Sequence, residues 1–185
     1  MIKSSESQLL LPAGKLGFGE CPKWVLDDED TIVAATFALL GSKQGLSHAE
    51  RRLLDTSRLT RAAVGETDAG YVTEIKDEIR KGRDPLGEAF LRVRSSVERR
   101  PLGAVYTPLD IVNSMVAWSS GSDTAPGRIV DVGAGSGRFI SAAAECFPEA
   151  DLHAAEIDPL SALILRANAR VRGFESRLSV HVENY

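Results

Sequence analysis

The stretch that most constrains the fold is residues 128–183, in which short apolar runs alternate with helix-type segments. The runs at 128–133, 151–157 and 178–183 are typical of strands, with "RIVDVG" as a buried first strand, and the segments at 137–147 and 159–173 are typical of helices. Pro148 and Gly173 stand where these two helices should end. Strand, helix, strand, helix, strand is the start of a doubly wound α/β sheet. We therefore expect a Rossmann-like half-sheet of three parallel strands.

The sequence before this stretch predicts a different architecture. Helices are predicted at 30–41, 47–65, 71–82, 84–100 and 107–119. Asp30, Ser47 with Glu50, Asp84 before Pro85, and Thr107 before Pro108 are the expected N-terminal caps, with Pro85 and Pro108 as first helical residues. Tyr71, Val72, Ile75 and Ile79 share one apolar face. We expect a helical N-terminal region over 1–104 and a second unit over 105–185.

Composition narrows the class of protein. The net charge of −4 arises wholly in residues 101–185, which carry 6 Lys and Arg against 10 Asp and Glu, whereas residues 1–100 carry 16 of each. Such a balance gives no general attraction to nucleic acid, so DNA contacts would need a local patch or regions outside the chain. Cys21 and Cys146 match no metal or redox spacing. No apolar run is long enough for a membrane helix, so we expect a cytoplasmic protein without a metal site.

The loop "GAGSG" at 133–137 follows the first predicted strand, at the sheet edge where such folds bind ligands. A dinucleotide fingerprint would need glycine at 138, but this residue is Arg138. The third glycine is instead Gly137, and Asp131 stands two residues before Gly133. Glu156, at the end of the second strand, can accept both hydroxyls of a ribose, as in NAD or a nucleoside. The alternative for the loop is a tight turn that needs glycine without binding a ligand. The alternative for Glu156 is a solvated acid at the end of a strand.

An acidic residue followed by Gly-x-Gly-x-Gly resembles the cofactor loop of class I methyltransferases that use S-adenosylmethionine. This resemblance implies that Asp131 receives the cofactor's ammonium group and that Gly133, Ala134, Gly135 and Gly137 approach it through their backbone. It also implies Glu156 on the ribose and Ile157 against the adenine. Asn184 and Tyr185, in "VENY" after the third strand, correspond to the polar and aromatic residues beside the adenine, although asparagine replaces the commoner aspartate.

The segment "GAVYTPLDIVNSMV" lies upstream of the loop. A Tyr-Thr-Pro helix start in this position resembles the N6-adenine DNA methyltransferases of the gamma motif order, which belong to restriction–modification systems. The resemblance covers residues 84–185. It implies that Tyr106, Thr107 and Pro108 close over the methionine end of the cofactor and that duplex DNA with a flipped-out adenine is the substrate. The alternative is that Thr107 only caps the helix that follows and does not contact the cofactor.

The family's base-holding Asn/Asp-Pro-Pro-Tyr/Phe turn is absent, because no two prolines are adjacent. We therefore expect no catalytic residue in this chain, which reads as the inactive N-terminal portion of an enzyme. A non-catalytic cofactor-binding or interaction module stays an alternative, as do methyltransferases for RNA, protein or small molecules. Arg92, Arg94, Arg99 and Arg100 could touch DNA phosphates, although a solvated helix face is the favoured interpretation. The family's strand order leaves the first strand with an open edge, so we expect self-association, an exchange of elements between chains, or packing of the N-terminal helices over this edge.

Overall fold

The computed structural model describes residues 26–56, 69–94, 106–121 and 125–183. Its helices are α1 (Glu29–Leu40), α2 (His48–Thr56), α4 (Ala69–Arg80), α5 (Pro85–Val93), α7 (Leu109–Ser119), α8 (Arg138–Cys146) and α9 (Pro159–Arg172), with a 3-10 turn η2 (Glu175–Arg177). Its strands are β1 (Arg128–Val132), β2 (Asp151–Ala155) and β3 (Leu178–His181). No helix of the described residues is both long and apolar enough to cross a membrane.

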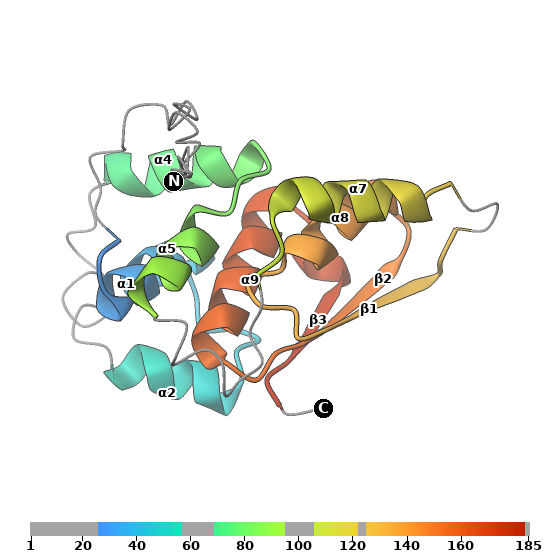
Figure 1. Cartoon of the computed structure of the whole chain (residues 1–185). Helices are drawn as coiled ribbons and strands as arrows, with labels where there is room; N and C mark the ends of the chain where they lie inside the picture. The colour runs from blue at the N-terminus through green and yellow to red at the C-terminus, as the bar shows by residue number, and fades with distance from the viewer. Residues whose placement is uncertain (1–25, 57–68, 95–105, 122–124, 184–185) are drawn as a thin grey trace, which may run out of the picture.

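The three strands form one parallel sheet in the order β1-β2-β3. Helix α8 connects β1 to β2 and α9 connects β2 to β3, and both pack on the same face of the sheet (Figure 1). This arrangement confirms the predicted half of a Rossmann-like α/β fold. The helices predicted at 137–147 and 159–173 are confirmed, and Gly173 ends α9 in the left-handed conformation.

Helix α9 lies between the N-terminal helices and the sheet (Figure 1), which explains why nine of its 14 residues are buried. Leu160, Leu163 and Ile164 join the core built by α1, α2, α4 and α5, whereas Leu165 and Ala169 join the core beneath the sheet. The helical region and the sheet thus share a helix. The predicted division into 1–104 and 105–185 stays a prediction.

The predicted caps of the N-terminal helices hold at two of three places. Ser47 and Glu50 exchange backbone-to-side-chain bonds of 2.7 and 3.2 Å, and Asp84 caps α5 by accepting from the Gly87 amide at 3.0 Å. The prediction of Asp30 as the cap of α1 is wrong. Asp28 holds that place, because its backbone is extended and its carboxylate accepts the Thr31 amide at 2.7 Å. Four acids follow one another here, so spacing alone could not select among them.

The boundaries of several predicted elements also shift. Helix α4 begins at residue 69, before the predicted 71, while Ile75 and Ile79 are fully buried as expected. Helix α5 ends at Val93, since Arg94 is extended. The rest of the predicted helices 47–65 and 84–100 lies outside the described residues.

The prediction that the first strand is buried is wrong. Along β1 exposed and half-buried residues alternate, and Val130 and Val132 keep 60% and 51% of their surface. Ile129 packs toward the helices, but among the described residues no helix covers the opposite face. The register places Val130 beside His153 on that open face. A short apolar run does not distinguish a strand that is covered on both faces of the sheet from one that is covered on a single face, because both are rich in branched apolar residues.

Candidate functional site

The loop between β1 and α8, residues 133–137, is called the glycine loop below. Gly133, Gly135 and Gly137 have φ angles of +77°, +56° and +87°, a region that side-chain-bearing residues rarely adopt. The amides of Gly133 and Ala134 both donate to the Ala155 carbonyl, at 2.9 and 3.0 Å. The loop is therefore anchored to the end of β2, and α8 begins directly after it.

Glu156 follows β2 and faces the glycine loop. One carboxylate oxygen accepts the Gly135 amide at 2.7 Å, and the other accepts the Asp158 amide at 2.8 Å. The residue is 8% exposed, so these bonds hold it in one orientation. Each carboxylate oxygen has a second lone pair, which leaves capacity for a pair of hydroxyl donors. The structure thus brings Glu156 to the loop, as predicted, and also shows that it supports the loop.

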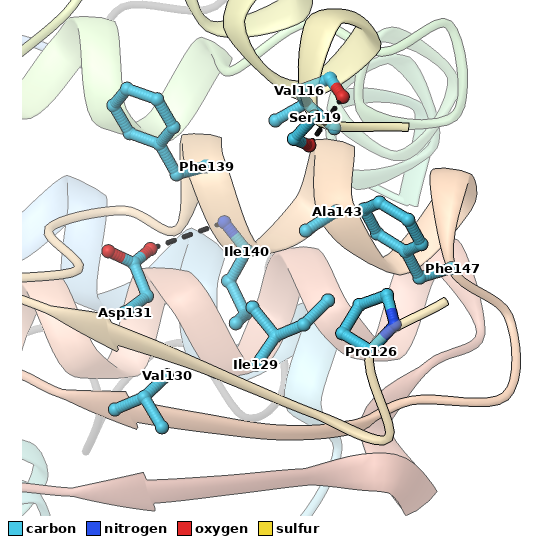
Figure 2. Close-up of a pocket in the computed structure, with 10 residues that line it drawn as sticks. All are labelled: Val116, Ser119, Pro126, Ile129, Val130, Asp131, Phe139, Ile140, Ala143 and Phe147. Atoms are coloured by element: carbon cyan, nitrogen blue, oxygen red, sulfur yellow. Dashed lines mark hydrogen bonds between the residues drawn. The ribbon is translucent and has the colours of Figure 1, made fainter. Parts of the chain in front are cut away.

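Asp131 lies on β1 with its carboxylate toward the N-terminus of α8, where it accepts the Ile140 amide at 3.2 Å (Figure 2). Burial raises the pKa of this carboxyl, the nearby Glu156 adds to the rise, and the Ile140 amide opposes it. A cationic group at this place would relieve the cost of the buried negative charge. Asp131 therefore fits the predicted partner of an ammonium group.

Tyr106 lies against Gly135 of the glycine loop. A Cβ atom added to Gly135 would come within 3.3 Å of the Tyr106 ring. The Tyr106 hydroxyl lies 3.3 Å from Ser161 Oγ, and burial raises the pKa of its phenol to about 12. The structure thus brings together two segments that are 29 residues apart in the chain, Tyr106 and Gly135.

The prediction that Thr107 caps the next helix, with Pro108 as its first residue, is wrong. Helix α7 begins at Leu109, Pro108 is the residue at its N-cap, and this end makes no side-chain cap bond. The Thr107 carbonyl instead accepts Arg138 Nη1 at 3.1 Å. The segment 106–108 is therefore fixed by contacts with α8 rather than by capping.

Four further residues were predicted to belong to the site: Gly137, Ile157, Asn184 and Tyr185. Ile157 is 38% exposed next to Glu156, as a side chain that packs on a ligand can be. Gly137 has a packing reason of its own, since an added Cβ would lie 2.9 Å from Leu165 Cγ. Asn184 and Tyr185 lie outside the described residues.

The predicted arginine patch does not hold at Arg94. Its side chain forms ion pairs with Glu29 and Asp158 and lies over the Phe90 ring, so it is occupied within the protein. Arg92 is exposed at the end of α5, and Arg99 and Arg100 lie outside the described residues.

A buried polar cluster beside the loop was missed by the sequence analysis. It consists of Asp84, Ser136, Arg138 and Asn168. The pair Asp84-Pro85 signalled a helix cap, but nothing in the sequence indicated that the same carboxylate also binds the glycine loop, 52 residues away.

A groove of about 450 Å³ lies beside the loop, between α7, α8 and β1 (Figure 2). Asp131 lies at one end of it, and Pro126 and Phe147 lie at the other (Figure 2). Its walls are mostly apolar. Among the described residues no group of three or more His, Cys, Asp and Glu side chains could hold a metal ion.

The residues at the loop suit S-adenosylmethionine in their chemistry. A carboxylate with a raised pKa matches an ammonium group, a fixed carboxylate with spare lone pairs matches a ribose diol, and an exposed Ile157 offers an apolar surface to a purine. The glycine loop with the N-terminus of α8 provides backbone close to the ligand. A dinucleotide would require its pyrophosphate near Asp131, which like charge disfavours.

Comparisons with known proteins agree with this chemistry. No family model matches the chain, and no solved structure matches it. The chain is 41% identical over 168 residues to the Type II methyltransferase M.XamI of Xanthomonas campestris pv. amaranthicola. The match covers 86% of the chain and 29% of that protein. Over most of its length the chain is thus similar to part of a Type II methyltransferase, of which it spans less than a third.

Proposed function

We propose that this chain is the S-adenosylmethionine-binding part of a site-specific DNA methyltransferase that modifies N6 of adenine. The observation that carries the proposal is the meeting of three segments: Tyr106 lies on Gly135, and Glu156 binds the Gly135 amide. The identity to a Type II methyltransferase supports DNA as the substrate. The Tyr-Thr-Pro segment upstream of the loop supports the gamma motif order, and with it adenine.

In this proposal each side chain has a defined task. Glu156 binds the ribose hydroxyls, Asp131 binds the ammonium group, and Ile157 packs on the adenine. Tyr106 and Thr107 enclose the methionine end. When bound, the cofactor supplies the methyl group that is transferred to the adenine. We assign no catalytic residue within the chain, because its sequence has no Pro-Pro turn to hold the target base.

Calorimetry with the chain tests the cofactor assignment. We expect S-adenosylmethionine to bind and NAD to bind far more weakly. Glu156→Ala should weaken binding of S-adenosylmethionine about tenfold or more, because hydrogen bonds to a carboxylate are lost. Glu149→Ala, which removes an exposed acid from the loop before β2, is the control and should bind as wild type does. Tight NAD binding, or unchanged affinity in Glu156→Ala, would contradict the proposal.

A further inference from the structure

Asp84 joins the helical region to the glycine loop. It caps α5, yet only 3% of its surface is exposed. One carboxylate oxygen accepts Ser136 Oγ at 2.5 Å and Arg138 Nε at 2.7 Å. Ser136 belongs to the glycine loop and is 1% exposed, so this contact reaches the loop through the protein interior.

The second oxygen of Asp84 reaches α9. It accepts the Gly87 amide at 3.0 Å and Asn168 Nδ2 at 3.3 Å. Asn168 Nδ2 also donates to the Ser136 carbonyl at 2.9 Å, so Asn168 binds the loop as well. A buried carboxylate with four donors has its charge stabilised and its position fixed.

Arg138 extends the cluster to the segment 106–108. Besides its bond to the Thr107 carbonyl, its guanidinium lies 5.4 Å from the centre of the Tyr106 ring. Only 11% of the Arg138 side chain is exposed, and the Asp84 carboxylate balances its positive charge at 2.7 Å. The ion pair therefore contacts the glycine loop and the residues that lie over it at the same time.

We propose that Asp84 is a positioning residue for the cofactor site. Through Ser136 and Arg138 it sets the conformation of the glycine loop and holds Tyr106 and Thr107 over that loop. The helical region then contributes to cofactor affinity without touching the cofactor. The identity of the ligand rests on the proposed function, whereas the control of the loop by Asp84 does not.

A second buried ion pair in the chain offers a matched control. Glu50 on α2 is fully buried and lies 2.6 Å from Arg166 on α9. Its other bond goes to the Ser47 amide, at the start of its own helix. Glu50→Gln removes one buried charge, as Asp84→Asn does, but at a place that does not contact the glycine loop. General destabilisation should be similar in the two variants.

Amide hydrogen exchange on the ligand-free chain separates the two roles. In Asp84→Asn the amides of Gly135 and Gly137 should exchange about tenfold faster than in wild type, relative to the amides of β2. In Glu50→Gln this ratio should stay at the wild-type value. Unchanged loop exchange in Asp84→Asn, or an equal effect of Glu50→Gln, would overturn the proposal.

Ser136→Ala is the second variant, because Asp84→Asn also breaks the ion pair with Arg138. Ser136→Ala removes one hydroxyl and keeps the ion pair between Asp84 and Arg138. We expect the amides of Gly135 and Gly137 to exchange faster than in wild type, but by a smaller factor than in Asp84→Asn. If Asp84→Asn does not fold, Ser136→Ala decides: loop exchange at the wild-type rate would overturn the proposal.

Calorimetry with S-adenosylmethionine completes the test. Asp84→Asn should weaken binding about tenfold, while Glu50→Gln should stay within twofold of wild type. Wild-type affinity in Asp84→Asn would overturn the proposal. If the wild-type chain binds no S-adenosylmethionine, the proposed function fails, and the exchange comparison still decides the role of Asp84.

Discussion

Glu156 and Asp131 illustrate how two carboxylates in one site acquire different tasks. Glu156 is held by two backbone amides and keeps the glycine loop in place before any ligand arrives. Asp131 has one amide partner and lies half-buried beside Glu156, so its negative charge is costly. The difference follows from position, since Asp131 lies within a strand and Glu156 lies in the turn after one. We expect Asp131 to respond to pH and to a bound cation.

The raised pKa of Asp131 predicts a pH-dependent stability. A carboxyl whose pKa is higher in the folded state favours folding at low pH, and this contribution is lost as the pH rises through the folded pKa. The free energy of unfolding of Asp131→Asn, minus that of wild type, should therefore increase from acidic to neutral pH. Urea unfolding at several pH values measures this difference. A difference that does not change with pH would contradict the assignment.

Most of the helices and strands could be predicted from the sequence, because the signals that end them are local. Gly41 and Gly173 end helices in the left-handed conformation, and Asp84 begins one. The error at Asp30 is local, because Asp28 two residues earlier caps the helix, whereas the error at Thr107 depends on a distant contact. Thr107 lacks its cap because Arg138 holds the segment, and nothing near Thr107 in the sequence indicates this.

The close approach of the glycine loop to α9 gives a prediction about Gly137. Gly137→Ala would place a side chain at positive φ and within 2.9 Å of Leu165, so we expect a loss of about 2–4 kcal/mol in the free energy of unfolding. Gly173→Ala is the matched control, since its φ is also positive but nothing lies within 4 Å. It should cost only about 1–2 kcal/mol. Urea unfolding compares the two, and equal losses would contradict the packing argument.

At the scale of the whole molecule, the sequence indicated the layers but not how they join. Strand and helix alternation predicted the sheet, and apolar faces predicted the helical region. Two features were not predicted: α9 contributes to both cores, and Asp84 links the start of α5 to the glycine loop. Both depend on contacts between segments far apart in the chain, which periodicity does not report. Glu156 and Tyr106 both contact Gly135, as the order of the motifs indicated, and their role in cofactor binding stays a prediction.

The unpaired backbone edge of β1 and its exposed apolar face together predict self-association. Val130 and Val132 are exposed on a strand that pairs only with β2 among the described residues, and such an edge can pair with another chain. Light scattering across a dilution series should show a mass that falls on dilution. Val130→Lys should reduce this association, whereas Gln44→Lys, in an exposed loop, should not. A monomer at all concentrations would contradict the prediction.

We propose that the glycine loop, Glu156 and Tyr106 form one site for S-adenosylmethionine. A titration of the isotopically labelled chain with S-adenosylmethionine, followed by the NMR signals of its backbone amides, tests it most directly. We expect the largest changes at residues 133–137, at Ile157 and at Tyr106, and little change in α1 and α2. Loop signals that stay unmoved at saturating cofactor, or changes confined to the groove near Val116 and Phe147, would contradict it.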